Sequence, residues 1–187
     1  MRFEKLVLAI LLFVGSQSVS HASLIDVDQT TAKTSFVAVG KPAMLRIRGE
    51  SEGITSKLNL ENKLVNGDVN VQLAKFKTGI ETRDEHMKKK YLEIEKFPEA
   101  VLHIKDFSVA ELKSGVKREL NFKANLSLHG VTKEVEVKSK LEAISDSKFK
   151  IQASASIKLS DFNIDIPSYA GIKVADSVDF EVQFQTK

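Results

Sequence analysis

The sequence predicts an all-β protein, an eight-stranded antiparallel barrel with one short amphipathic helix. Apolar and polar residues alternate with a period of two over much of the chain, as they do in strands that have one apolar and one polar face. One segment has the spacing of an amphipathic helix instead. Because a single short helix cannot cover the apolar faces of long strands, we expect the strands to cover one another in an up-and-down barrel.

Residues 1–22 have the layout of a secretory signal peptide. Two basic residues precede an apolar run at 6–14, and the triplet at 20–22 has small residues at its first and third places. The run is too short to cross a bilayer, which takes about 20 apolar residues. We therefore expect residues 23–187 to form one exported domain, periplasmic or secreted.

The expected strands follow the alternation along the chain. In the first half it is short and weak, as where Phe36 and Ala38 alternate with Ser35 and Val37. In the second half it is long and regular, and every even position from Leu120 to Leu128 is apolar. We expect about eight strands among the nine alternating stretches at 35–38, 45–48, 58–60, 69–74, 100–105, 119–128, 131–143, 148–159 and 178–185.

The expected helix lies within 81–95, a segment dense in charge. Met87, Tyr91 and Ile94 recur there at helical spacing. We expect Thr82 or Asp84 to cap its start, and Pro98 to prevent its continuation.

His129 and Gly130 lie between two strands in register, and this position predicts a hairpin turn. The alternative is a chemical role, since His129 with Thr132 and nearby Glu134 suggests acid–base work.

The interior of such a barrel is either filled with side chains or holds one small ligand. Ala124, Ala153 and Ala155 lie among the bulky residues of the apolar face. Their small side chains leave room for a cavity, or they fit the taper of a filled barrel. Both alternatives remain open.

Several strings of residues stand in a specific order over essentially all of residues 23–187. They are Thr78-Gly79-Ile80-Glu81-Thr82-Arg83-Asp84-Glu85-His86-Met87, Tyr91-Leu92, Phe97-Pro98, Leu128-His129-Gly130-Val131-Thr132-Lys133, Ser160-Asp161-Phe162-Asn163-Ile164 and Val174-Ala175-Asp176-Ser177-Val178. In this order and spacing they resemble the YceI-like family of bacterial periplasmic or secreted proteins. The resemblance implies a lipocalin-like barrel with an elongated apolar pocket, a polyisoprenoid or other long-chain amphiphile as ligand, no cofactor and no established catalysis.

The candidate ligand-binding residues are the bulky side chains expected on the apolar face, with four more at its lid or mouth. The alternative is that they simply form the core. The expected lining is Phe36, Leu45, Ile47, Leu73, Leu102, Ile104, Phe122, Leu126, Phe180 and Phe184, and the lid or mouth is Met87, Tyr91, Phe162 and Tyr169.

Charged residues of the expected helix are candidates for contact with a lipid head group. Arg83 or His86 would meet a polar or phosphorylated head, or else hold the helix in place. The run 88–90 of three lysines would attract anionic lipid or a membrane surface, or else form a solvated face.

Other classes of function lack their sequence signals. The chain has no cysteine, which excludes disulfides and thiolate chemistry, and a formal charge of +3 does not predict a nucleic-acid-binding stripe. His86, His103 and His129 have no paired spacing for a metal, so no metal and no cofactor is expected. No P-loop, dinucleotide fingerprint or G-x-S-x-G motif occurs.

Three hypotheses follow from this sequence. The first is a protein that sequesters or carries a long-chain lipid such as a polyisoprenoid. The second is a lipid-modifying enzyme that uses the same cavity, and the third is an interaction protein with a filled barrel. Transient membrane contact and a homodimer are left open.

Overall fold

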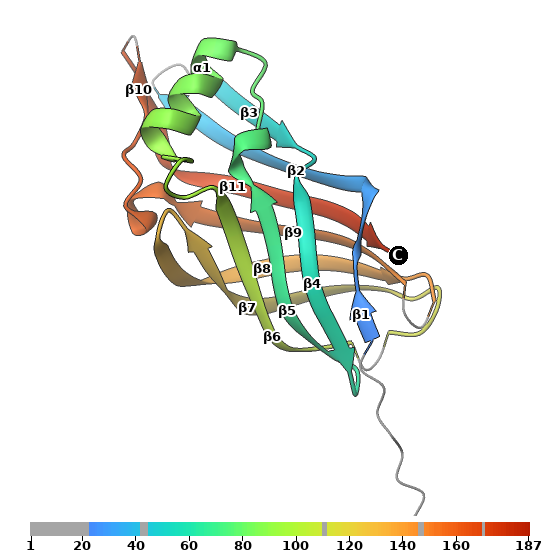
Figure 1. Ribbon diagram of the computed structural model, residues 1–187. Coiled ribbons are helices and arrows are strands. Elements are labelled where there is room, and N and C mark those ends of the chain that lie inside the picture. Colours follow the sequence, from blue (N-terminus) through green and yellow to red (C-terminus); the bar gives the residue numbers. More distant parts are fainter. Residues whose placement is uncertain (1–22, 42–44, 110–111, 146–147, 170) are drawn as a thin grey trace, which may run out of the picture.

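The computed structural model describes residues 23–41, 45–109, 112–145, 148–169 and 171–187, and most of them lie in strands (Figure 1). The strands are β1 (Ser23–Ile25), β2 (Val27–Lys41), β3 (Leu45–Ser51), β4 (Ile54–Glu61), β5 (Leu64–Gln72), β6 (Glu99–Ser108), β7 (Lys117–Leu128), β8 (Val131–Ala143), β9 (Phe149–Lys158), β10 (Ser168–Tyr169) and β11 (Ile172–Thr186). The helical elements are η1 (Leu73–Lys75), α1 (Glu81–His86), η2 (Met87–Tyr91) and η3 (Leu159–Phe162).

All strands belong to one curled antiparallel sheet in the order β1-β4-β5-β6-β7-β8-β9-β11-β2-β3, with β10 paired to β11 outside that order. The all-β, antiparallel, lipocalin-like prediction is confirmed, but the number of eight strands is wrong. One reason is that the first length of chain forms two strands. It breaks at Asp26, where β1 pairs with β4 while β2 pairs with β11 and β3.

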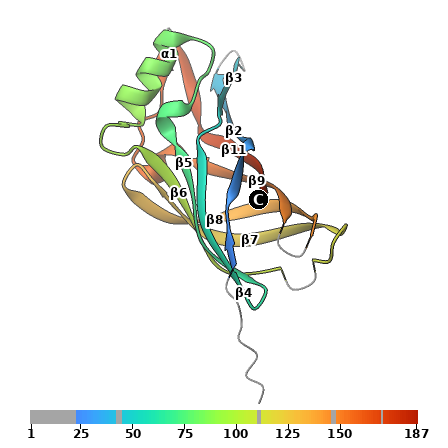
Figure 2. The same cartoon turned by 45° about the vertical axis from the view of Figure 1, so that its right-hand side comes forward.

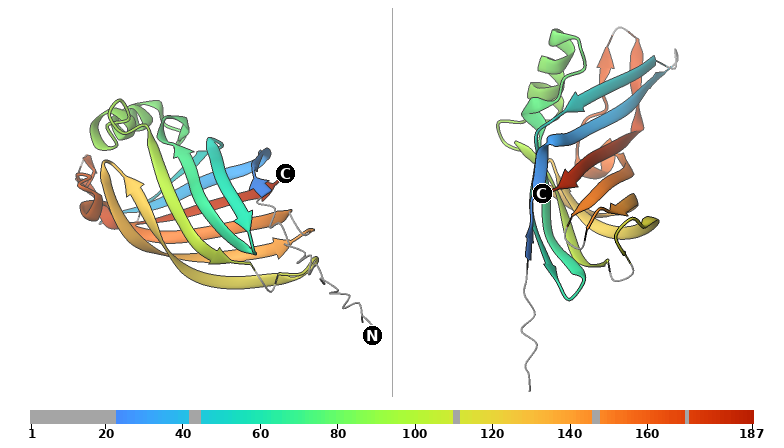
Figure 3. Two further views of the ribbon diagram at one scale, coloured as in Figure 1. Left: turned by 60° about the horizontal axis from the view of Figure 1, so that its bottom comes forward. Right: turned by 90° about the vertical axis from the view of Figure 1, so that its right-hand side faces the viewer.

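Because the chain changes its pairing partners at Asp26, β1 lies at one end of the strand order while the following strand β2 lies near the other end. The sheet therefore returns on itself where β1 meets β4. In the described residues no ladder joins β3 to β4 or β5, and the bridge between Glu50 and Lys77 links β3 to the segment after η1. The result is a curled half-barrel rather than the fully closed barrel that we predicted (Figure 3).

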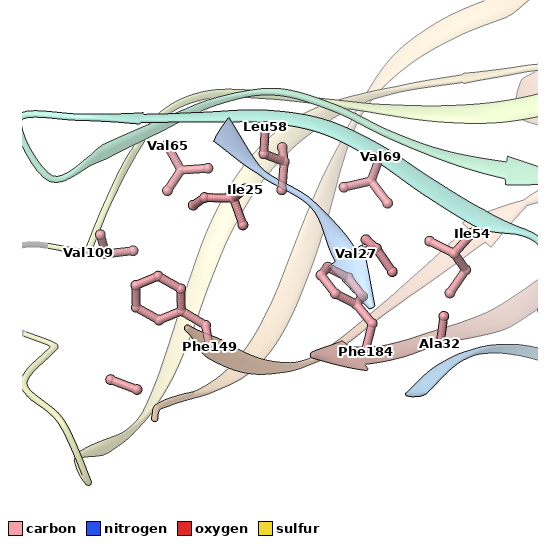
Figure 4. Close-up of a cluster of buried hydrophobic side chains, with 11 residues drawn as sticks. Ile25, Val27, Ala32, Ile54, Leu58, Val65, Val69, Val109, Phe149 and Phe184 are labelled. Carbon is pink, nitrogen blue, oxygen red and sulfur yellow. The ribbon is translucent and has the colours of Figure 1, made fainter. Parts of the chain in front are cut away.

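Alternation along the strands places two buried clusters inside the curl. The base cluster contacts β1 and the start of β4, and Figure 4 shows its side chains converging from several strands. It consists of Ile25, Val27, Ala32, Ile54, Leu58, Val65, Val69, Val109, Ala143, Phe149 and Phe184. The helix-side cluster packs against Met87, Tyr91 and Leu92, and consists of Ala38, Leu73, Phe76, Leu128, Ile157, Leu159, Phe162, Ile164 and Val178.

The predicted hairpin turn at His129 and Gly130 is confirmed. β7 ends at Leu128, β8 begins at Val131, and these two residues are paired. His129 has φ 51° and Gly130 has φ 76°, so both central residues have the left-handed backbone of a tight two-residue hairpin. A Cβ at Gly130 would lie 2.8 Å from the Phe97 ring, so a residue with a side chain would also clash at this position.

The predicted helix is present but shorter than 81–95. It runs as α1 and then widens into one π-helical turn, η2, with the Leu92 amide donating to the Met87 carbonyl at 2.9 Å. The capping prediction is wrong, because Ile80 occupies the N-cap and no side chain caps it. The helix also ends at Tyr91, well before Pro98. Figures 1 and 2 place it at the end of the sheet opposite the β4–β5 turn.

Candidate functional site: an apolar cavity under the helix

A cavity of about 820 Å³ lies inside the curl. Its wall takes side chains from all ten strands of the sheet order and from α1 and η2, and most of them are apolar. Ligand pockets of drug-sized molecules typically measure about 300–1,000 Å³. The cavity is therefore large enough for a long chain, and it favours an open interior over the filled barrel.

The wall includes twelve of the fourteen side chains predicted from the sequence. Leu45 is 45% exposed and Phe184 is 5% exposed, so the set extends from the rim to the base cluster. That these side chains contact a ligand stays a prediction. Those on the wall are Phe36, Leu45, Ile47, Leu73, Met87, Tyr91, Leu102, Ile104, Phe122, Leu126, Phe180 and Phe184.

The other two predicted residues differ. Phe162 is only 1% exposed and packs in the helix-side cluster, but it is not among the lining residues. It lies in η3, where the period of two that guided the prediction stops. Tyr169 lies in β10, and its side chain is outside the described part of the structure.

The two head-group candidates also lie on the wall, both on α1. Arg83 is held in place: its Nε donates to the Thr78 hydroxyl and its Nη2 to the Thr78 carbonyl, each at 2.7 Å. Asp84 accepts from the Thr78 amide at 2.8 Å and from its hydroxyl. His86 is exposed at the rim. These bonds favour the structural role for Arg83, and its contact with a head group stays a prediction.

The three lysines at 88–90 do not act as one basic patch. Lys89 Nζ donates to Glu85 at 2.7 Å, and this hydrogen bond lowers the pKa of Glu85 and raises the pKa of Lys89. Lys90 lies on the cavity wall, with Nζ 5.4 Å from the centre of the Tyr91 ring. Lys88 is half-buried.

Three of the Ser and Thr residues that line the cavity, Thr34, Ser139 and Thr186, are buried, and the sequence reasoning did not name them. Ser139 donates to the Leu120 carbonyl at 3.1 Å, and Thr186 accepts from the Phe149 amide at 2.8 Å. Thr34 has no hydrogen-bond partner among the described residues. The signal was present in the sequence, because Thr34 stands in phase with apolar Phe36 in its strand.

The His129 side chain is 9% exposed and contacts residues of neighbouring segments. Its Nδ1 lies 3.1 Å from the Phe162 carbonyl oxygen and its Nε2 3.0 Å from Glu93 Oε2, while its ring centre lies 4.6 Å from that of Phe97. Hydrogen bonds from Lys96, at 2.6 Å, and from His129 lower the pKa of Glu93. His129 is not a lining residue, so it joins the hairpin to neighbouring segments instead of facing a ligand.

His103 belongs to a chain of polar side chains on the outer face of the sheet. Its Nδ1 lies 2.8 Å from Asp68 Oδ1 and its Nε2 2.9 Å from Ser127 Oγ. This is the order of groups in a serine-hydrolase triad. However, the neighbouring Leu102 and Leu126 line the cavity, so these polar groups point away from it.

The cavity itself offers little for catalysis. Apart from Tyr91, its ionisable lining residues in the described chain are Arg83, Glu85, His86 and Lys90, all on α1 or η2 at one end. The described residues contain no cluster of three His, Asp or Glu side chains that could hold a metal ion. Within the same ranges, no helix is long and apolar enough to cross a membrane. The arrangement suits the burial of an apolar chain.

Comparison with known proteins gave one family and several solved structures. A polyisoprenoid binding domain from Saccharophagus degradans, implicated in plant cell wall breakdown, is 18% identical and superposes with a TM-score of 0.72 over 88% of this chain and 99% of its own. BcnA from Burkholderia cenocepacia is 18% identical, with a TM-score of 0.68 over 87% of this chain and 100% of its own. A YceI protein from Campylobacter jejuni is 18% identical, with a TM-score of 0.56 over 75% of this chain and 85% of its own. No curated protein matches. The YceI-like domain model matches residues 25–186, and the chain therefore belongs to the YceI-like domain family.

Proposed function

We propose that this protein binds one long-chain apolar lipid, a polyisoprenoid or a similar amphiphile, and sequesters or carries it in the cavity. The observation that carries this proposal is the 820 Å³ cavity with its largely apolar wall. The polyisoprenoid binding domain of the similar Saccharophagus degradans structure supports the choice of ligand class.

Binding would rest on burial of the chain rather than on directed polar contacts. A hydrocarbon chain gains roughly 25 cal/mol for each Å² removed from water, before the costs of ordering and association are subtracted. Such a ligand needs area and shape, and the wall provides both from every strand of the sheet order.

The head group of the lipid would remain at the helix end of the cavity. Arg83, His86 and Lys90 all lie on the wall there, and they favour a polar or anionic head. Leu45 and Ile80 are also lining residues and are 45% and 51% exposed. Their exposed apolar surface is where we propose that the lipid enters, in transient contact with a membrane.

We also propose that residues 1–22 direct export and are removed. The first residue of the mature protein would then be Ser23. N-terminal sequencing of protein recovered from the periplasm or the medium tests this, and an exported chain that still begins at Met1 would contradict it.

The decisive test of lipid binding is a variant that fills the cavity. Ala155 lies on the wall opposite Phe180 in the β9–β11 register, so Ala155→Phe places a ring in the path of the chain. The matched control is Ser156→Phe, on the exposed face of the same strand.

We expect polyprenols to displace a fluorescent fatty-acid probe from the wild type and from Ser156→Phe. The affinity of Ala155→Phe for polyprenols should be at least tenfold lower. Native mass spectrometry of the purified protein should find an amphiphile in the first two. If no long-chain lipid binds to the wild type by either method, the proposed function is wrong.

A further inference from the structure

The outer face of the sheet is basic where β2 ends, where β3 begins and where β11 begins. Leu45, Ile172 and Val174 line the cavity there, so the residues that alternate with them in the same strands face outward. Four of these outward residues are exposed cations, and we call them the basic tip: Lys41, Arg46, Arg48 and Lys173.

The register of the strands brings like charges together in the basic tip. Lys41 is directly opposite Lys173 in the β2–β11 ladder. Arg46 is opposite Val39, two residues before Lys41 in the same strand, and is therefore the diagonal neighbour of Lys41. Like charges directly opposite one another destabilise a sheet, so the fold itself gains nothing from this arrangement.

Little negative charge offsets the basic tip. Of its four residues, only Arg48 forms an ion pair within the described part of the chain, with Glu50 at 2.9 Å. Asp176, further along β11, accepts hydrogen bonds from the Ser160 amide at 2.8 Å and from its hydroxyl at 2.6 Å. A group of cations that raises the energy of the fold and lacks acidic neighbours indicates a negatively charged partner.

Exposed apolar side chains beside the basic tip indicate which kind of partner this is. Leu45 precedes Arg46 in β3, is 45% exposed and lines the cavity, and Ile80, 51% exposed, lines the same cavity from the helix side. Figures 1 and 2 place the start of β3 and α1 at the same end of the molecule. Cations beside apolar side chains suit a bilayer interface, where phosphates meet the cations and the apolar groups reach the acyl boundary.

We propose that the basic tip docks this protein onto a bilayer rich in anionic phospholipid, with Leu45 inserted at the level of the head groups. The mouth of the cavity then faces the acyl chains. This inference rests on the proposed function and specifies the partner from which the lipid enters: a membrane surface with an excess of phosphate charge.

The chain offers a matched pair of double variants. Lys41→Gln with Lys173→Gln removes two cations from the basic tip and relieves their repulsion, so this variant should fold at least as well as the wild type. Lys33→Gln with Lys150→Gln removes the same charge from exposed positions opposite Gln183 and Gln185 of β11. Lys33 is roughly 25 Å from Lys41 along β2, well beyond the screening length of about 8 Å at physiological salt.

Co-sedimentation with vesicles of phosphatidylglycerol and phosphatidylcholine in equal parts measures docking. We expect the wild type to bind these vesicles, to bind pure phosphatidylcholine vesicles far more weakly, and to be released by added salt. The tip variant should bind the anionic vesicles about 25-fold more weakly, because each basic residue near an anionic surface adds about fivefold. The control variant should differ from the wild type by less than about twofold.

Tryptophan fluorescence measures insertion directly, because the chain contains no tryptophan. In Leu45→Trp the emission should shift to the blue when anionic vesicles are added. Leu24→Trp, at a residue of β1 that is 80% exposed, is the matched control and should show no shift. A shift of the same size in both proteins would contradict docking through the basic tip.

The outcomes separate this inference from the proposed function. Displacement of a fluorescent fatty-acid probe by polyprenol in the absence of vesicles should be the same for the wild type and the tip variant. If the tip variant and the control variant lose vesicle binding equally, or if the wild type does not prefer anionic vesicles, docking through the basic tip is wrong while lipid binding stands. If the anionic vesicles bind as expected but polyprenol displaces no probe from the wild type, the proposed function is wrong while docking stands.

Discussion

His129 has hydrogen-bond acceptors at both ring nitrogens, the Phe162 carbonyl and the Glu93 carboxylate. The Glu93 carboxylate also accepts a hydrogen bond from Lys96. The contacts at the hairpin therefore include a carboxylate whose ionised form is favoured by its neighbours.

Glu93→Gln tests the role of this ionised form. The pKa of Glu93 lies below its ordinary value of 4.5 because Lys96 and His129 donate hydrogen bonds to the carboxylate. A carboxyl group with a lowered pKa in the folded state stabilises the fold above the unfolded-state pKa, and this contribution is lost as the pH falls through the folded-state pKa. We expect the wild type to exceed Glu93→Gln in free energy of unfolding near neutral pH, and the difference to vanish in acid.

Urea unfolding at a series of pH values from about 7 to about 3 measures this difference. Glu95→Gln, an exposed change in the same segment, is the control and should show a smaller pH dependence. A difference between wild type and Glu93→Gln that stays constant down to the acid end would contradict the ionic role.

The sequence predicted the turn at His129 but not the contacts of its ring. The turn is a local property, set by two in-register strands and by Gly130, and the period of two reveals it. Glu93 and Phe162 come from segments far away in the chain, and no periodicity connects them to His129. In the same way Asp84 was expected to cap a helix, whereas it bonds back to Thr78 in the preceding loop.

At the scale of elements, the short strand β1 determines whether the sheet returns on itself. Its two neighbouring side chains differ sharply: Ile25 is 4% exposed within the base cluster, and Leu24 is 80% exposed. Since β1 pairs only with β4, its attachment depends on three residue pairs and on the burial of Ile25.

Ile25→Ala should therefore lower the free energy of unfolding by about 2 kcal/mol, the low end for such a change, because Ile25 also lines the existing cavity. The matched control Leu24→Ala removes a similar volume from the exposed face and should change stability by less than about 0.5 kcal/mol. Equal effects of the two changes in chemical denaturation would mean that β1 does not pack as described.

The alternation predicted the long strands well because β7, β8, β9 and β11 each have one face in the interior. It did not predict the switch of partners at Asp26, because periodicity says which face is buried and nothing about which strand is adjacent. The π-helical turn of η2 was also missed, since its widened spacing hardly changes the apolar pattern of Met87 and Tyr91.

At the scale of the whole molecule, the cavity couples ligand binding to stability. A ligand that binds only the folded protein raises its free energy of unfolding by about 2.7 kcal/mol at a concentration of 100 times Kd. For a chain of this size each kcal/mol raises the melting temperature by about 2–4 °C. We expect saturating polyprenol to raise the Tm of the wild type by roughly 5–10 °C.

Differential scanning calorimetry of the wild type and of Ala155→Phe, each with and without lipid, measures this shift. The filled variant should melt at the same temperature in both conditions. A shift of the same size in both proteins would mean that the lipid binds outside the cavity.

The ladder between β2 and β11 pairs Val27 with Thr186, which brings the two ends of the described chain side by side. Such pairings close very long loops, and folds that depend on them form slowly. β2 has to wait for β11, which is synthesised last, before its ladder with that strand can form. Until then the nascent chain cannot complete its sheet. Under the export that we propose for this chain, the same register would delay folding and keep the chain in a form that can be translocated.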